Sequence, residues 1–152
     1  MKFVYNDGGR KSSGYRGDAG DCFTRAVSIV TGKPYREVYK EVNLWGKDER
    51  YMKGRLGIEY ILGRGSSARD GVWKKTANEY LRYIGLIWTP CMKVGQGCRV
   101  HLRDGELPMG RLLVQVSKHY VAVIDGVIHD THDCSRNGNR CVYGYWSLPC
   151  ES

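Results

Sequence analysis

Cys22 is the first residue of the chain whose type and setting suit covalent catalysis. It follows a Gly-rich segment, residues 8–20, and it opens a stretch in which apolar residues recur at helical spacing: Phe23, Ala26, Val27 and Val30. The free N–H groups and the dipole of a helix N-terminus favour a thiolate, and the Cys22 N–H could donate to an oxyanion. The plainer interpretation is a small apolar side chain at the start of a core helix.

A histidine and an aspartate follow far downstream on two consecutive predicted strands. Asp125-Gly126 is a strong signal for a two-residue hairpin turn. That turn places Ile124 opposite Val127, so that His119 and Asp130 share one face of the hairpin as diagonal neighbours. The Asp130 carboxylate could then hold the His119 ring and stabilise its protonated form, which predicts a Cys–His–Asp arrangement.

Two other histidines compete for roles in this arrangement. His129 is adjacent to Asp130 in sequence, but it points to the opposite face of the hairpin and is the poorer candidate base. His132 lies opposite His119 in a segment that is predicted to be a loop, and it is a rival to Asp130 as the orienting group. Taken singly, His119 and Asp130 could also be ordinary surface residues of a strand and a turn.

The elements that position these residues are expected to be helices in the first half of the chain and strands in the second half. Residues 1–20 are predicted to form a loop. A helix is expected from Cys22, with Asp21 as N-cap and Gly32 as C-terminal stop. A second helix is expected from Pro34 to about Asn43, and a third over residues 71–84. Strands are expected over residues 86–88, 112–117, 118–124, 127–131 and 141–146. The order predicts a single α+β domain over residues 1–152, with N-terminal helices packed on a C-terminal antiparallel sheet.

Six cysteines allow either a disulfide framework or a set of free thiols. No export signal or membrane span is evident, so we expect a cytoplasmic protein with reduced thiols, no membrane contact and no cofactor. The alternative is a structural zinc site in the C-terminal part of the chain, formed by His132, Cys134, Cys141 and Cys150. No phosphate-binding or dinucleotide-binding glycine motif is present.

The net charge is +8, from 24 basic and 16 acidic residues, and the isoelectric point is near 9.2. The basic residues are scattered, with no run longer than Lys74-Lys75. This distribution is typical of a solubilising surface, and it also allows weak binding to polyanions.

The segment from Gly20 to Ala26, which reads Gly-Asp-Cys-Phe-Thr-Arg-Ala, resembles the start of the catalytic helix in papain-like cysteine peptidases. The segment from Lys118 to Val123 resembles the histidine strand of their bacteriocin-processing branch, in which an aspartate follows on the next strand. The resemblance implies a papain-like fold with Cys22 as nucleophile, His119 as general base and Asp130 as the orienting residue. About thirty residues carry it; residues 43–110 resemble no family.

The sequence departs from the family pattern in the oxyanion hole. These enzymes usually place a glutamine a few residues before the cysteine, whereas residues 14–20 contain no glutamine or asparagine. Besides the Cys22 N–H, the remaining candidate donors are Arg16 and, from farther away, Asn6.

The pattern therefore predicts a cysteine-dependent hydrolase that cleaves a peptide, isopeptide or related amide bond in a protein or peptide substrate. One alternative is a cell-wall amidase or endopeptidase with the same triad, because a phage- or bacterium-encoded lytic protein can lack an export signal. Another is a non-catalytic basic module, a nucleic-acid binder or protein inhibitor, that uses the same fold.

Overall fold

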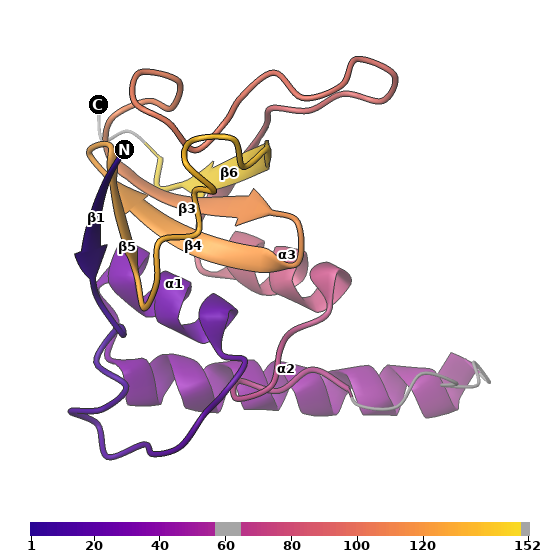
Figure 1. Cartoon of the computed structure of the whole chain (residues 1–152). Helices are drawn as coiled ribbons and strands as arrows, with labels where there is room; N and C mark the ends of the chain where they lie inside the picture. The colour runs from indigo at the N-terminus through magenta and orange to yellow at the C-terminus, as the bar shows by residue number, and fades with distance from the viewer. Residues whose placement is uncertain (57–64, 150–152) are drawn as a thin grey trace.

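In the computed structural model, which describes residues 1–56 and 65–149, three helices pack against one face of an open, six-stranded mixed sheet (Figure 1). The predicted α+β layout is therefore confirmed. The helices are α1 (Cys22–Thr31), α2 (Tyr35–Leu56) and α3 (Lys74–Tyr83). The strands are β1 (Lys2–Tyr5), β2 (Ile87–Pro90), β3 (Arg111–Val116), β4 (His119–Ile124), β5 (Val127–Asp130) and β6 (Val142–Ser147). Their order across the sheet is β1-β5-β4-β3-β6-β2.

The β4–β5 hairpin has the predicted turn and register. Asp125 and Gly126 both have positive φ angles, 48° and 79°, as a two-residue hairpin turn requires. Ile124 pairs with Val127, and the pairing continues to Ala122 and His129. Because side chains alternate along each strand, this register sends His119 and Asp130 to the same face of the hairpin.

Strand β1 corrects two expectations. Residues 2–5 do not belong to an N-terminal loop, and the sheet is not purely antiparallel, because β1 pairs in parallel with β5 from Lys2–Val127 to Tyr5–Asp130. All four residues of β1 are exposed. The strand therefore lacks the alternation of buried apolar and exposed polar residues by which a strand is predicted from sequence. It is held by backbone pairing, which the Asn6 N–H continues with a 2.9 Å hydrogen bond to the Asp130 carbonyl.

Helix α1 lies against β4 and forms the centre of the core between the helices and the sheet. Phe23 packs edge-on against Tyr80 of α3 and Tyr120 of β4. The helix ends as predicted at Gly32, which has a φ of 77° and donates its N–H to the Ser28 carbonyl. The first residue of α1 therefore has a fixed position at one end of the sheet.

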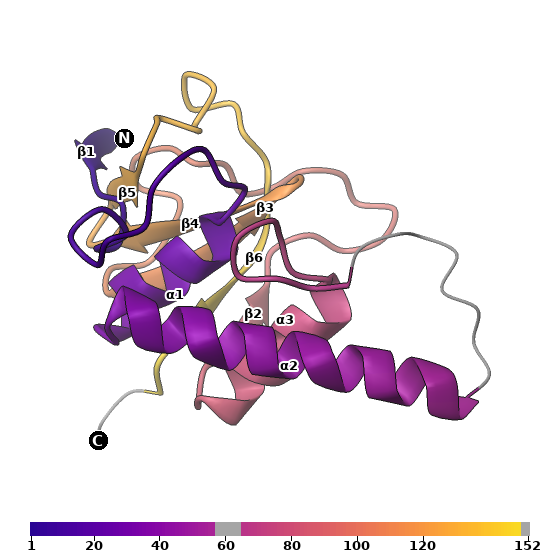
Figure 2. The same cartoon turned by 90° about the horizontal axis from the view of Figure 1, so that it is seen from below.

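Helix α2 begins as predicted but is much longer than expected. It continues past Asn43 to Leu56 and extends alongside α1 and α3 (Figure 2). Beyond Asn43 the sequence of the helix becomes rich in charged residues and includes two glycines, so the apolar periodicity that marks a buried face is weakened. Tertiary contacts hold this part of the helix: Trp45 packs on Tyr80, and Glu49 accepts hydrogen bonds from the Ser66 N–H and the Thr76 hydroxyl.

The other face of the sheet carries a second apolar cluster, which includes Val114, Val121 and Ile128. The segment 91–110, which we call the covering loop, packs on this cluster through Val100, Leu102 and Leu107 and lies on the side of the sheet opposite the helices (Figure 1). None of the helices in the described part of the chain combines the length and apolar character that a membrane crossing requires.

The cysteines do not all remain reduced. Cys98 of the covering loop forms a disulfide with Cys141, whereas Cys22, Cys91 and Cys134 are free. The expectation of reduced thiols is therefore wrong for Cys98 and Cys141. Because Cys141 is bonded to Cys98, it does not act as a thiolate ligand in the zinc site that was considered as an alternative. Cys150 lies outside the described residues.

Candidate active site

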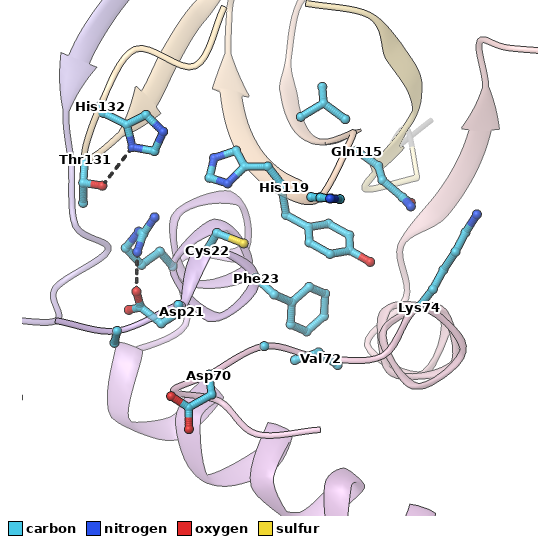
Figure 3. A pocket seen from close by; sticks show the side chains of 17 residues that line it. Asp21, Cys22, Phe23, Asp70, Val72, Lys74, Gln115, His119, Thr131 and His132 are labelled. Carbon is cyan, nitrogen blue, oxygen red and sulfur yellow. Dashed lines mark hydrogen bonds and ion pairs between the residues drawn. The ribbon is translucent and has the colours of Figure 1, made fainter. Parts of the chain in front are cut away.

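Cys22, His119 and Asp130 are each at the end of an element, and the fold brings these three ends together. Cys22 is the first residue of α1, His119 the first of β4 and Asp130 the last of β5. The Cys22 side chain, at the N-terminal end of the helix, lies beside the His119 ring (Figure 3). The three side chains therefore come from different parts of the sequence and meet where β4 begins and β5 ends.

His119 bridges the other two side chains. Its Nε2 atom lies 2.6 Å from Oδ2 of Asp130, which leaves Nδ1 as the ring nitrogen that can exchange a proton with a thiol. Burial opposes protonation of His119, but hydrogen bonds to Asp130, Cys134 and Cys22 outweigh it and raise the pKa of the ring. Burial likewise opposes ionisation of Asp130, and the hydrogen bond from His119 lowers its pKa. The pair thus favours imidazolium and carboxylate.

The surroundings of Cys22 favour the thiolate. Burial by itself would raise the pKa of this thiol, but the hydrogen bond and the charge of His119 lower it, together with the backbone N–H of Tyr120 and the charge of Arg25. The N-terminal position in α1 acts in the same direction, because the first N–H groups of a helix have no partners within it. Together these groups support a thiolate–imidazolium pair.

Arg25 is a part of the site that sequence reasoning missed. It lies one turn into α1, is 8% exposed, and donates from Nη2 to Oδ1 of Asp130 at 3.1 Å. The Thr131 N–H donates to the same oxygen at 2.6 Å. Each carboxylate oxygen of Asp130 therefore has its own partners, Arg25 and Thr131 on one side and His119 on the other, which fixes the plane of the carboxylate.

The same guanidinium joins Asp21, and through it the N-terminal segment, to the site. Asp21 is 2% exposed and pairs with Arg25 across one helical turn. Its second oxygen accepts a 2.6 Å hydrogen bond from the Tyr35 hydroxyl, which in turn accepts one from Arg10 at 3.1 Å. Asp21 occupies the predicted N-cap position but makes no side-chain capping bond, because both oxygens serve this buried network. The available signal was Arg25 itself, the one charged residue between Asp21 and Gly32, placed four residues after Asp21.

A cavity of about 650 Å³ opens beside Cys22. His119, Thr131 and His132 line one side, and Gln115 and Lys74 lie on the other (Figure 3). The floor is formed in part by the segments around Gly20 and Asp70-Gly71-Val72. Gln115 is only 8% exposed and interrupts the apolar strand β3, and this polar residue was the sequence signal for a cavity-facing amide.

The two side chains expected as alternative oxyanion donors are not among the residues lining this cavity. Asn6 contacts His129 through Nδ2 at 3.3 Å and accepts a hydrogen bond from the Gly8 N–H. Arg16 borders a neighbouring cavity of about 460 Å³, and its carbonyl accepts a bond from Arg10. The Cys22 N–H, by contrast, belongs to a residue that lines the larger cavity.

His119, Asp130 and His132 present potential metal-ligand atoms within 4.8 Å of one another, and this is the one such group among the described residues. The two histidine rings lie 5.3 Å apart, centre to centre. Two imidazoles and a carboxylate would suit zinc. A metal ion at this position would compete with Cys22 for His119, so the metal and the thiol chemistry exclude one another.

No known family, curated protein or solved structure matches the chain.

Proposed function

We propose that the protein is a cysteine-dependent hydrolase that cleaves a peptide, isopeptide or related amide bond through Cys22, His119 and Asp130. The observation that carries the proposal is the position of His119, whose ring lies 2.6 Å from the Asp130 carboxylate through Nε2 and sits beside the Cys22 side chain (Figure 3). A base placed between a nucleophile and an orienting group is the arrangement that covalent acyl transfer requires.

The reaction follows from this geometry. The Cys22 thiolate attacks the carbonyl carbon, and the oxyanion that forms accepts a hydrogen bond from the Cys22 N–H. The His119 imidazolium then donates its proton to the leaving amine, which departs and leaves a thioester on Cys22. His119, now neutral, takes a proton from water as the water attacks the thioester. The acid product leaves and the thiolate–imidazolium pair is restored.

The arrangement supports a papain-like assignment for the fold. A helix with the nucleophile at its first residue packs on a sheet whose adjacent strands carry the histidine and the aspartate. The absence of a glutamine before Cys22 is consistent with a different second oxyanion donor. Gln115 and Lys74 are candidates for this second donor, because both have N–H groups and both line the Cys22 cavity.

The test is the reactivity of Cys22 toward iodoacetamide at limiting reagent, followed by mass spectrometry, across pH and without reductant. We expect Cys22 to react well below pH 8 and faster than Cys91, and we expect His119→Ala to remove this advantage. His129→Ala is the matched control, since His129 lies on the same hairpin but contacts Asn6. Equal reactivity of Cys22 and Cys91, or indifference to His119, would contradict the thiolate–imidazolium pair.

Activity is then measured on protein, isopeptide and cell-wall peptide substrates, with and without a chelator. Thiol hydrolysis predicts an acyl adduct on Cys22, loss of activity in Cys22→Ser and no effect of the chelator. Activity that survives Cys22→Ser but is lost in His132→Gln and with the chelator would instead assign the His119–Asp130–His132 group to a metal ion.

A further inference from the structure

A second group of side chains has the composition of a reactive thiol centre. His101 places Nε2 at 3.5 Å from Sγ of Cys98, and its Nδ1 lies 3.2 Å from Oε1 of Glu106. The hydrogen bond from His101 lowers the pKa of the Glu106 carboxyl, so a carboxylate orients the ring. Glu106 is itself held by an ion pair with Arg103 at 2.8 Å. The order thiol, imidazole and carboxylate repeats that of the Cys22 site at a separate place in the fold.

The sulfur in this group is accessible and already bonded. Cys98 is exposed and forms the disulfide with Cys141, which lies just before β6 and is partly exposed. Backbone hydrogen bonds run beside the disulfide, from the Leu102 N–H to the Arg140 carbonyl and from the Val142 N–H to the Val100 carbonyl, at 2.9 and 2.8 Å. These bonds keep the two segments together whether or not the sulfurs are joined, so the disulfide can open without separating its partners.

We propose that Cys98, His101 and Glu106 form a thiol–disulfide exchange centre, which joins and opens the Cys98–Cys141 bond in reaction with low-molecular-weight thiols and disulfides. A purely structural disulfide needs no imidazole beside one of its sulfurs. An imidazole at 3.5 Å can accept the thiol proton of Cys98 in the reduced protein and stabilise the Cys98 thiolate as a leaving group during reduction.

Oxidation of the two thiols takes two exchange steps. Reduced Cys98 transfers its proton to His101, and the thiolate attacks one sulfur of a low-molecular-weight disulfide, which releases one thiolate and leaves a mixed disulfide on Cys98. The Cys141 thiol gives its proton to the small thiolate already released, attacks the Cys98 sulfur and releases the second small thiolate, which takes the proton held by His101. Two protein thiols lose two electrons and two protons, and the small disulfide gains both to become two thiols. Reduction by an excess of small thiol is the reverse of these steps.

The test uses the full chain with Cys22→Ser, so that its outcome is independent of the proposed hydrolase. The protein is reduced, freed of reductant and mixed with glutathione disulfide, and the adducts are mapped by mass spectrometry over time. Adding Cys141→Ser should trap the mixed disulfide on Cys98. We expect Cys98 to react about tenfold faster than Cys91, and His101→Gln to remove most of that difference.

Glu106→Gln keeps the size of the side chain and should slow Cys98 by a smaller factor. Thermal unfolding and the rate of Cys91 modification report whether each variant is folded. The proposal is overturned if Cys98 reacts no faster than Cys91 in the trapped protein, or if folded His101→Gln and Glu106→Gln both react at the original rate.

Discussion

Arg25 and Asp130 are 105 residues apart in the chain, and their side chains meet in the interior at 3.1 Å, Nη2 to Oδ1. The contact joins the helix that begins at Cys22 to the strand that ends at Asp130. Because Arg25 also pairs with Asp21, beside Cys22, a single guanidinium links both buried carboxylates. The position of Asp130 relative to Cys22 is therefore set by a charge contact as well as by the sheet.

Replacing Arg25 should weaken the fold and the site together. Arg25→Met leaves Asp130 with His119, and Asp21 with Arg10 at 3.7 Å, as their remaining cationic partners. We expect the free energy of unfolding to fall by up to about 3–5 kcal/mol. Urea denaturation measures this loss. Adding Asp130→Asn should recover part of it, because one of the two carboxylate charges that lost Arg25 is removed. Full additivity of the two substitutions would show that the contact contributes nothing.

Asp130→Asn tests the orienting role directly. The amide has no charge to stabilise the His119 imidazolium and can present an N–H to the ring, which selects the wrong tautomer. We expect hydrolysis to fall by about 10²–10⁴-fold and Cys22 to lose its advantage in alkylation. His132→Gln is the comparison, since His132 is the rival partner of His119. A larger loss in His132→Gln than in Asp130→Asn would reverse the assignment.

The His119–Asp130 contact should make stability depend on pH with a defined sign. Burial lowers the pKa of His119, but hydrogen bonds to Asp130, Cys134 and Cys22 together raise it to about 11, whereas an unfolded histidine titrates near 6.5. Between these values the folded protein binds the extra proton, so the stability that the contact provides is complete below about pH 6.5 and declines as pH rises. The measurement uses a Cys22→Ala background. In the native protein the proton lost by the Cys22 thiol would cancel the proton gained by His119 in the pH dependence.

The measurement is the difference in unfolding free energy between Cys22→Ala and Cys22→Ala/His119→Gln, taken at several pH values from 6 to 10. A difference that shrinks with rising pH agrees with the raised pKa. A constant or growing difference would mean that His119 is not held protonated by Asp130.

Gly144 of β6 offers a packing prediction outside the site. A Cβ atom there would lie 2.4 Å from the Trp88 ring and 2.7 Å from the Thr89 carbonyl. Gly144→Ala should therefore destabilise the protein by about 1–3 kcal/mol, measured by urea denaturation. Combined with Trp88→Ala, which removes the ring, Gly144→Ala should lose much of its own effect. If Gly144→Ala destabilises the native protein and the Trp88→Ala variant equally, the added Cβ clashes with the Thr89 carbonyl and not with the ring.

The core of the site could be predicted because local rules determine it. A helix start at Cys22 follows from the apolar spacing, and a two-residue turn at Asp125-Gly126 fixes which residues of the hairpin share a face. The hairpin register alone then places His119 and Asp130 next to each other. These two relationships depend only on nearby sequence, whereas the approach of Cys22 to His119 depends on how α1 packs against β4.

The features that were missed depend on distant parts of the chain. The exposed strand β1 exists because β5 offers it a free edge, and α2 continues past Asn43 because Ser66 and Thr76 bind Glu49. The Cys98–Cys141 bond spans 43 residues, and six cysteines allow too many pairings for spacing to select one.

The distance in sequence between Arg25 and Asp130 also has a consequence during protein synthesis. A ribosome adding about 5–20 residues per second needs roughly 5–20 s to travel from one codon to the other. Throughout that interval Cys22 has neither His119 nor Asp130 beside it and remains an ordinary thiol. The proposed thiolate–imidazolium pair thus cannot form until β4 and β5 have been made, and a message truncated before His119 yields a chain without it.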